Sequence, residues 1–399
     1  MPRIVITGVG VISPNGGIGK DSFSNAIFGG ISGIKQISLF DTSDFKTKTA
    51  AQIDNFMPEN IIGKDGLRVL DRSTKLLCSS AKMALDDAGF AVTEGNCRDV
   101  GLAVGNTFGS LQSISDFDKV AIKEGPKYIN PSLFPNTVIN AGASQTAIRL
   151  NIKGFNVTIS TGFSASLDAV IYAADSIKLG RKNMVLAGGV EELSVQEFIG
   201  FYRAGCLAGL EDGSSELSCP FDRRRNGIIL GEGSAIFVLE KLESALGRGA
   251  HIYAEIKSYG SYFGAKDAMS QAMAKVSLGT EKIDYICCAA NSTKELDRQE
   301  TSAIKEALAA KADSAKIGSI KSMIGECFSA SGALQLAAGV CAIEKQMAAP
   351  NLNYEEPDPD CGLSYTPGKA VSSEIENVLI NAFSIGGSNS SLMISKFAG

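Results

Sequence analysis

One turn has the setting of a nucleophile but lacks the nucleophile. Residues 156–175 (NVTISTGFSASLDAVIYAAD) predict a buried strand, a turn of small residues and a helix. At a helix N-terminus, free N–H groups and the helix dipole stabilise an anion, and a cysteine placed there is activated as a thiolate. The turn carries Phe163, which has no nucleophilic atom.

Two further turns carry polar side chains. Asn291 can donate and accept hydrogen bonds but cannot carry a proton near pH 7. Glu326 could act as a base if burial raised its pKa, and Lys321 could stabilise an anion or pair with Glu326. Plainer roles are core packing for Phe163, turn capping for Asn291, and a salt-bridged or exposed helix-start carboxylate for Glu326. Together these residue types make a poor catalytic set.

Alternating strands and helices must position these turns. The pattern predicts strands at 3–9, 99–105 and 184–189 and helices at 72–89 and 164–180, which favours a layered α/β fold. Sites in such folds lie at the carboxyl ends of the strands. We expect four small-residue turns to converge there: 161–166, 289–293, 321–332 and 383–389.

The second half of the chain repeats the plan of the first. Residues 252–260 and 283–291 predict strands, and 376–399 predict two strands around a glycine turn. Residues 317–346 repeat the strand, turn and helix of 156–180. We expect a duplicated unit with halves at 1–245 and 246–399.

Composition excludes several classes of function. The 399 residues are 44% hydrophobic and 20% charged, and the net charge of −5 argues against non-specific nucleic-acid binding. Nine cysteines without a CxxC pair argue against a metal or disulfide framework. The sequence shows no signal peptide and no apolar run of about 20 residues, so we expect a cytoplasmic protein without a membrane segment. The single histidine, His251, rules out a mechanism in which this chain supplies two imidazoles.

Two surface features have more than one interpretation. The basic turn 222–227 (DRRRNG) fits a structural salt-bridge cluster or a docking patch for an acidic partner. Four apolar residues with helix-like spacing fit core packing, subunit packing or a channel wall: Phe108, Leu111, Ile114 and Phe117. The G-x-G of TGVGVISPNG lacks the third glycine and the acidic partner of a dinucleotide site, and no cofactor is expected.

Six segments, in chain order, resemble motifs of the β-ketoacyl synthases, the condensing enzymes of fatty-acid and polyketide synthesis. They are VITGVGVISPNG, GLAVGNTFGSL, LAGGVEELS, CPFDRRRNGIILGEGSAIFVLE, KSMIGECFSASGAL and NAFSIGGSNSSL. The resemblance spans the full chain. It implies a thiolase-like fold, with duplicated βαβαβαββ halves in a five-layer αβαβα arrangement.

The resemblance implies that all three reactive groups are replaced. The family uses a cysteine that takes the acyl chain as a thioester and two histidines that assist decarboxylation of the malonyl extender. The cysteine position falls on Phe163, the first histidine (A-H-G-T) on Asn291 of A-N-S-T, and the second (K-S-M-T-G-H) on Glu326 of K-S-M-I-G-E. Supporting positions that match the family are Lys321, Asp297 and Glu300.

The pattern looks like the chain-length factor of type II ketosynthase pairs, which lacks the cysteine, dimerises with the catalytic subunit and shapes its acyl tunnel. Typical chain-length factors have glutamine at the cysteine position. Phe163 departs from that and would fill a vacant pocket. The aromatic gate of the family loop F-G-F-G-G is Ile385 here, and the chain is short between Tyr262 and Met273, where active synthases usually have a longer loop.

The resemblance therefore implies a non-catalytic subunit that forms a heterodimer with a catalytic ketosynthase in polyketide, polyene or fatty-acid synthesis. Phe108, Leu111, Ile114 and Phe117 would form the floor of the partner's tunnel. The acidic acyl carrier protein is the usual second partner, with docking candidates Arg203, Arg223, Arg224 and Arg225.

Two alternatives remain open at this stage. One is an acyl-thioester enzyme with a repurposed site built from Glu326, Asn291 and Lys321, which reactivity at Cys327 would support. The other is a homodimeric pseudoenzyme that acts as a scaffold.

Overall fold

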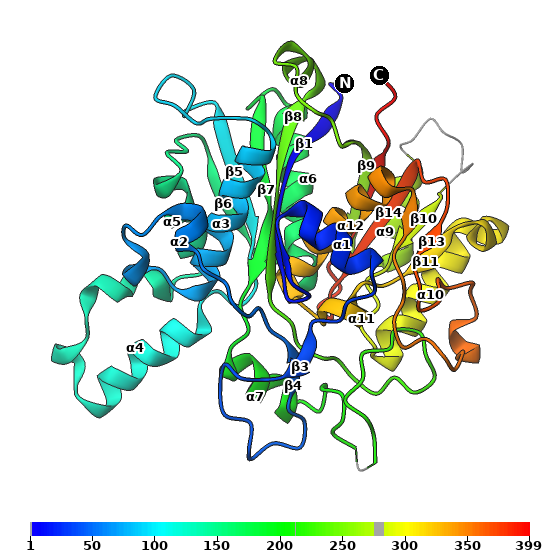
Figure 1. Ribbon diagram of the computed structural model, residues 1–399, viewed down its shortest axis with the longest axis horizontal. Coiled ribbons are helices and arrows are strands. Elements are labelled where there is room, and N and C mark those ends of the chain that lie inside the picture. The colour runs from blue at the N-terminus through cyan, green and yellow to red at the C-terminus, as the bar shows by residue number, and fades with distance from the viewer. Residues whose placement is uncertain (1, 212, 275–282) are drawn as a thin grey trace.

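Two central helices separate the two halves of the fold (Figure 1). The computed structural model describes residues 2–211, 213–274 and 283–399. Helices α6 (Ala165–Lys178) and α12 (Ser331–Lys345) contact each other and pack against strands on both sides. Every residue of α12 from Ser331 to Ile343 is buried, as expected for a helix enclosed on all sides.

The two halves have the same strand order and the same strand directions. In the N-terminal half the order is β1-β8-β7-β5-β6, and in the C-terminal half it is β9-β15-β14-β10-β11. In each half the three outer strands are parallel, and the two remaining strands are antiparallel to their neighbours. The bounds are β1 (Ile4–Ser13), β5 (Val100–Gly105), β6 (Asn156–Ile159), β7 (Met184–Glu191), β8 (Gly233–Lys241), β9 (Ala254–Tyr262), β10 (Tyr285–Cys287), β11 (Lys316–Gly318), β14 (Asn377–Phe383) and β15 (Asn389–Ser395).

Outer helices complete the five layers. Helices α3 (Arg72–Asp87) and α5 (Ala141–Arg149) cover the N-terminal half, and α9 (Ala265–Ala274) and α10 (Lys294–Leu308) cover the C-terminal half. Antiparallel pairing of β1 with β9, from Ile4–Ile256 to Ile6–Ala254, joins the strands of both halves. The thiolase-like α/β fold expected from the sequence is confirmed.

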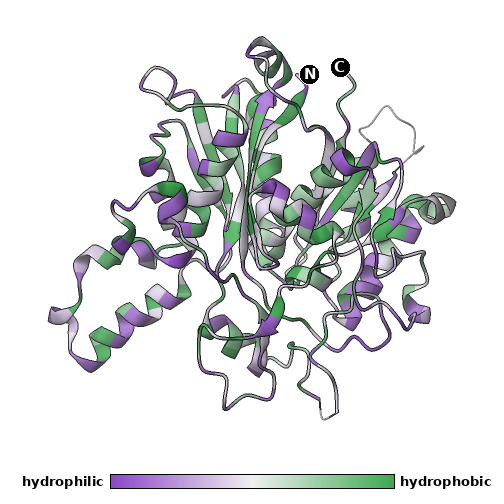
Figure 2. Cartoon of the chain, viewed as in Figure 1, coloured by the Kyte–Doolittle hydropathy of each residue, from purple (hydrophilic) through white to green (hydrophobic). Residues whose placement is uncertain are grey.

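Glycine allows α3 to lie directly on β1. A Cβ at Gly8 would lie 2.2 Å from the carbonyl oxygen of Ala84, and one at Gly10 would lie 1.9 Å from that of Ser80. Any side chain at these positions would push the helix off the strand. Figure 2 shows hydrophobic residues concentrated in the strands and central helices.

An arm extends from the body of the N-terminal half (Figure 1, cyan). It consists of α4 (Leu111–Lys123) and the short 3-10 helices η2 (Pro126–Tyr128) and η3 (Pro131–Thr137). Phe108 precedes α4 and lies in a turn, so the helix-like spacing continues into a helix only for Leu111, Ile114 and Phe117.

The remaining elements are short and connect the layers. They are β2 (Gly17–Ile18), β3 (Ile34–Gln36), β4 (Thr49–Ala51), β12 (Met347–Ala348), β13 (Val371–Ser372), α1 (Lys20–Phe28), α2 (Glu59–Ile62), α7 (Val195–Arg203), α8 (Leu242–Gly247), α11 (Lys321–Ile324), η1 (Leu67–Val69), η4 (Gly162–Ser164), η5 (Ala309–Ser314), η6 (Phe328–Ala330) and η7 (Pro359–Cys361). Among the described residues, no helix is both long and apolar enough to cross a membrane.

Candidate functional site

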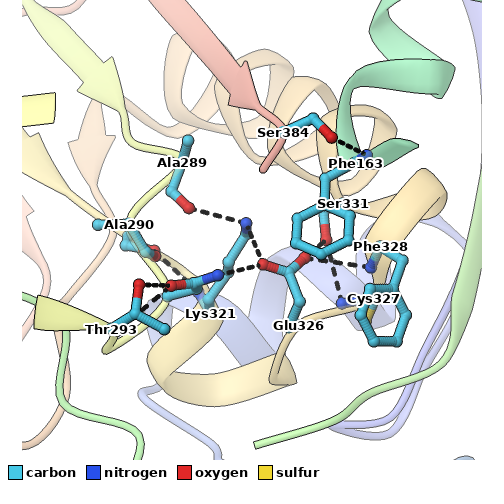
Figure 3. A network of polar contacts seen from close by, with 12 residues as sticks. Phe163, Ala289, Ala290, Thr293, Lys321, Glu326, Cys327, Phe328, Ser331 and Ser384 are labelled. Atoms are coloured by element: carbon cyan, nitrogen blue, oxygen red, sulfur yellow. Dashed lines mark hydrogen bonds and ion pairs between the residues drawn. The ribbon is translucent and has the colours of Figure 1, made fainter. Parts of the chain in front are cut away.

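The four small-residue turns converge on one place, as the sequence predicts. The backbone N–H of Phe163 donates to Ser384 Oγ at 3.3 Å, which joins the first turn to the last. Asn291 Nδ2 donates to Glu326 Oε2 at 2.8 Å, which joins the second to the third. Both the β6–α6 and the β11–α12 connections therefore bring their helix N-termini to this site (Figure 3).

Glu326 is the centre of the polar side of the site. Its Oε2 accepts from Asn291 Nδ2 and from Lys321 Nζ, each at 2.8 Å. Its Oε1 accepts from Ser331 Oγ at 2.7 Å and from the backbone N–H of Phe328 at 3.1 Å. Glu326 and Lys321 are both buried, so this is an internal ion pair and not an exposed helix-start carboxylate. Both carboxylate oxygens are fully engaged within the protein.

Lys321 and Asn291, the side-chain partners of Glu326, each make a further hydrogen bond within the protein. Lys321 Nζ also donates to the carbonyl oxygen of Ala289 at 2.8 Å. Asn291 Oδ1 accepts from Thr293 Oγ1 at 2.8 Å. Both ends of the Asn291 amide are therefore used, which goes beyond the predicted role of a turn cap.

Two buried carboxyl groups accept hydrogen bonds from the backbone of the Asn291 turn. Glu300 accepts from the backbone N–H groups of Ala289 at 2.9 Å and Ala290 at 2.7 Å, and burial raises its pKa to about 7. Asp297 accepts from the N–H of Asn291 at 3.0 Å, and burial raises its pKa to about 6. These matched family positions lie behind the turn and shape it.

The opposite side of the site is filled with aromatic rings. Phe328 lies at the centre, with ring centroids 5.1 Å from Phe163, 5.1 Å from Phe108 and 4.9 Å from Phe201. Phe163 and Phe328 are buried, so the packing role predicted for Phe163 agrees with its surroundings. We call Phe163, Phe328, Phe108 and Phe201 the aromatic plug.

Sequence reasoning missed the central ring of the plug. Phe328 adopts a φ of 45°, a left-handed conformation that is rare for a bulky side chain. The signal was present in the sequence: Phe328 lies within the predicted 321–332 turn, two residues after Glu326. Its conformation and ring partners depend on distant segments.

The helix N-terminus at Phe163 is closed by Ser384. Backbone N–H groups in such a turn are the donors that can stabilise a developing oxyanion, and here the N–H of Phe163 already donates to the Ser384 hydroxyl. Ser384 follows Phe383 in F-S-I-G-G, where the family loop has glycine. The next residue, Ile385, is 78% exposed, and its predicted gating role stays a prediction.

Cys327 does not provide a reactive thiol. Its Sγ lies 3.3 Å from the carbonyl oxygen of Ile324 and 3.4 Å from that of Glu232, and burial raises the pKa of the thiol further above its usual value. The reactivity that would have supported a repurposed acyl-thioester site is not favoured. Within the described ranges no group of histidine, cysteine or acidic side chains could hold a metal ion.

The predicted docking arginines have different environments. Arg203 ends α7 and is exposed. Arg223 is 68% exposed and pairs with Glu356 at 2.8 Å. Arg224 is partly exposed and pairs with Asp222 at 2.9 Å.

Arg225 is the exception among the docking candidates. Its side chain is 2% exposed and pairs with Asp297 at 3.5 Å and with Asp358. A buried guanidinium cannot contact a carrier protein, so the docking role predicted for Arg225 is wrong. The alternative interpretation of this turn, a structural salt-bridge cluster, fits Arg225.

The remaining predicted residues lie on the arm or on the C-terminal half outside the four turns. Leu111, Ile114 and Phe117 on α4 are partly buried, and the Phe117 ring lies 6.1 Å from that of Phe134 in the same arm. Strand β9 ends at Tyr262 and α9 begins at Ala265, so only residues 263 and 264 connect them. His251 is exposed and precedes β9.

Duplicated halves and four converging turns define the scaffold of a condensing enzyme, in which this chain carries a phenylalanine, an asparagine and a glutamate at the reactive positions. Residues 1–245 match the family model of the β-ketoacyl synthase N-terminal domain, and residues 253–355 match that of the C-terminal domain. The chain belongs to the β-ketoacyl synthase family.

Individual relatives cover the whole chain. The 3-oxoacyl-[acyl-carrier-protein] synthase 2 of Coxiella burnetii (strain RSA 493 / Nine Mile phase I) is 34% identical over 99% of this chain and 98% of its own length. The tetracenomycin polyketide synthase ketoacyl synthase alpha subunit of Streptomyces glaucescens is 32% identical over 99% of this chain and 97% of its own. Similarity therefore extends to relatives named for fatty-acid-type and for polyketide synthases.

A solved structure is similar over the full length. The ishigamide ketosynthase/chain length factor superposes with a TM-score of 0.91 at 31% identity, covering 100% of both chains. A chain from a type II PKS acyl-carrier protein in complex with its ketosynthase matches with a TM-score of 0.88 at 29% identity, over 99% of this chain and 100% of that one.

Proposed function

We propose that this chain is a non-catalytic, chain-length-factor-like subunit. It pairs with a catalytic β-ketoacyl synthase and shapes the acyl tunnel of that partner in type II polyketide, polyene or fatty-acid synthesis. The observation that carries the proposal is the state of the three reactive positions. Phe163 fills space, Asn291 donates to Glu326, and Glu326 also pairs with Lys321.

The hydrogen bonds of Glu326 argue against a repurposed catalytic base. A general base must reach the proton that it removes. Glu326 would have to release Lys321 or Ser331 to do so, and separating a buried ion pair leaves an uncompensated charge. Cys327 is buried, and burial raises the pKa of its thiol, which argues against acyl transfer through Cys327.

The arm supports a partner on the N-terminal half. Its exposed side chains include Ile122, Tyr128 and Phe134, and large apolar side chains exposed on one projecting element are typical of a protein interface. Strand β6 lies at the end of the strand order, and its residues are partly exposed. One solved relative is itself described as a ketosynthase/chain length factor. We place the catalytic partner against this arm.

Surface arginines suit the docking of a carrier protein. Arg203, Arg223 and Arg224 remain on the surface after Arg225 is excluded. Their charge suits an acidic partner. One solved relative is a type II PKS acyl-carrier protein in complex with its ketosynthase.

The test is reconstitution with a catalytic ketosynthase that has the reactive cysteine. We would co-express the two, separate them by size exclusion, and measure the intact mass of each subunit after adding malonyl-loaded carrier protein. Each subunit alone is assayed in parallel, and the pair is repeated with the partner's cysteine changed to alanine.

We expect a 1:1 complex that elongates chains, with the acyl group on the partner's cysteine and this chain unmodified. The cysteine-to-alanine pair should be inactive. A stable homodimer that does not bind the ketosynthase would favour the scaffold alternative. Turnover of an acyl thioester by the lone chain, lost on Glu326→Gln, would favour the repurposed enzyme.

A further inference from the structure

We infer that Phe328 and Glu191 couple the vacated site to the arm, and that they are positioning residues for the product length set by the pair. The inference deepens the proposed function and rests on it for product length. It begins from the observation that Phe108, the plug residue nearest the arm, belongs to the turn from which α4 starts.

A row of rings links the site to the base of the arm. Phe163 packs on Phe328 at 5.1 Å, and Phe108 meets Phe328 edge-on at 5.1 Å with an interplanar angle of 89°. Phe201 stacks on Phe328 at 4.9 Å and lies 6.1 Å from Phe108. Phe201 is carried by α7, which also contacts α4. A change in the ring of Phe328 should therefore shift both the turn that contains Phe108 and helix α7, which contact the start of the arm.

A buried carboxyl group makes the same link through the backbone. Glu191 Oε1 accepts from the N–H of Phe108 at 3.2 Å, and Oε2 accepts from the N–H of Thr107 at 3.3 Å. Glu191 Oε2 also accepts from Ser329 Oγ at 2.6 Å. One side chain thus holds the turn before α4 against the residue that follows Phe328. Burial raises the pKa of Glu191 to about 7.

The turn has a third tie to the site. Thr107 Oγ1 donates to the carbonyl oxygen of Gly162 at 2.7 Å, next to Phe163. The N–H of Gly109 donates to Asn106 Oδ1 at 2.9 Å, and Gly109 has a φ of 68°. The chain then enters α4 at Leu111. Each residue from 106 to 109 is fixed by the site, by its own turn or by both.

These contacts give the ring of Phe328 a structural role that accounts for its left-handed backbone being kept. A leucine at position 328 would keep apolar contact but remove ring volume, and cores answer such changes with shifts of side chains and backbone. The shift would fall on Phe108 and so on the orientation of α4. If α4 lines the partner's tunnel, the ratio of product lengths changes while the partner's chemistry remains intact.

The chain offers matched controls. Phe198 is fully buried in the same apolar cluster, and its ring partners are Phe40, Phe45 and Tyr202, outside the plug. Phe198 lies on α7 with Phe201, so Phe198→Leu removes the same volume from this helix while leaving every ring of the row in place. Glu192 is buried beside Glu191 and accepts from the N–H of Ser73, on α3. Glu192→Gln is thus the control for Glu191→Gln.

The first measurement uses the chain alone and does not depend on any partner. Hydrogen exchange of residues 111–123 is compared among Phe328→Leu, Glu191→Gln and the two controls, with thermal unfolding recorded for each. We expect exchange in α4 to rise by about fivefold in Phe328→Leu relative to Phe198→Leu. Equal exchange in α4 for test and control variants would overturn the coupling.

The second measurement uses the reconstituted pair. Phe328→Leu should change the ratio of the two most abundant product lengths by about fivefold relative to Phe198→Leu, at a comparable total rate. Elongation by both variants with the same product lengths would overturn the positioning role alone. Failure of the unsubstituted chain to pair would contradict the proposed function, and the positioning role would fall with it. Should Phe328→Leu not fold, Glu191→Gln against Glu192→Gln gives the same comparison.

Discussion

The C-terminal half contributes a buried ion pair to the vacated site, whereas the N-terminal half contributes a phenylalanine in an aromatic plug. On the polar side, Glu326 is held by four hydrogen bonds, one of them from Lys321. On the aromatic side, Phe163 contacts the ring of Phe328 and has no polar function. Phe163 and Glu326 lie in the turns of the two equivalent strand–turn–helix units of the duplicated fold.

This difference has an energetic consequence. A buried charge that loses its partner is left unsolvated, and the cost is large and abrupt. A ring that is trimmed leaves a cavity whose cost grows with its volume and shrinks where neighbours relax. The polar side should therefore tolerate substitution poorly, and the aromatic side should tolerate it in proportion to the volume removed.

The largest effect is expected for Lys321→Met. It leaves the buried carboxylate of Glu326 without its cation, and we expect the free energy of unfolding to fall by ~3–5 kcal/mol. Urea unfolding at neutral pH measures the loss. The double variant Lys321→Met/Glu326→Leu should recover most of it, because no charge remains buried. A double variant as unstable as the single one would contradict the ion-pair account.

The next effect is expected for Phe163→Ala. Removing the ring should lower the free energy of unfolding by ~3 kcal/mol, and Phe163→Leu should cost about 1 kcal/mol because it keeps most of the volume. Unfolding of the two variants under the same conditions gives the comparison. If Phe163→Leu were as costly as Lys321→Met, the contrast between the two sides would be wrong.

A smaller effect concerns pH and a buried acid behind the aromatic side. Burial, followed by the charge of Asp71, raises the pKa of Glu192 to about 8, and its Oε1 has no hydrogen-bond partner among the described residues. An unfolded glutamate titrates near pH ~4.3. The folded state thus binds one more proton between these values, so the stability from Glu192 is complete below pH ~4.3 and is lost as the pH rises through about 8.

Glu192→Gln should therefore flatten the pH dependence. Between pH ~6 and ~8 the unsubstituted chain should lose roughly 2 kcal/mol of stability more than the variant. Chemical unfolding across this range measures the difference. Glu94→Gln is the control, because Glu94 is exposed and bonded to Lys153. Parallel pH profiles for the unsubstituted chain and Glu192→Gln would contradict the assignment.

The smallest effect is expected at the surface. Arg223 and Glu356 form an exposed pair, and Arg223→Ala should change the free energy of unfolding by less than ~1 kcal/mol. The same unfolding assay applies. Binding of the pair to carrier protein, measured at low and high salt, separates docking from stability: a salt-dependent loss of affinity supports docking, and unchanged affinity contradicts it.

The sequence predicts the layout of the site better than its contacts. Alternation of strands and helices, and the repeat of 156–180 in 317–346, suffice to bring the four turns together. Helix α6 was expected at 164–180 and spans Ala165–Lys178. Strand β10 was expected at 283–291 and covers Tyr285–Cys287, because the residues that follow form the turn held by Glu300.

The side-chain contacts within the site could not be predicted from the pattern of strands and helices. Sequence reasoning left open whether Glu326 is exposed, because its partner Asn291 lies 35 residues earlier in the chain. Arg225 was grouped with its neighbours by composition, yet the turn directs it inward to Asp297 and Asp358. The left-handed backbone of Phe328 has no signature in residue type, and its ring partners Phe108 and Phe201 lie far away in the chain.

The most direct test of the central claim is the intact mass of the purified chain after incubation with acyl- and malonyl-loaded carrier protein. A catalytic ketosynthase is treated in parallel to show that the carriers are competent. We predict no acyl adduct on this chain and no elongated product, because Phe163 offers no nucleophile and Glu326 is bound to Lys321. An adduct on this chain, or elongation that Glu326→Gln abolishes, would show that the site is still in use.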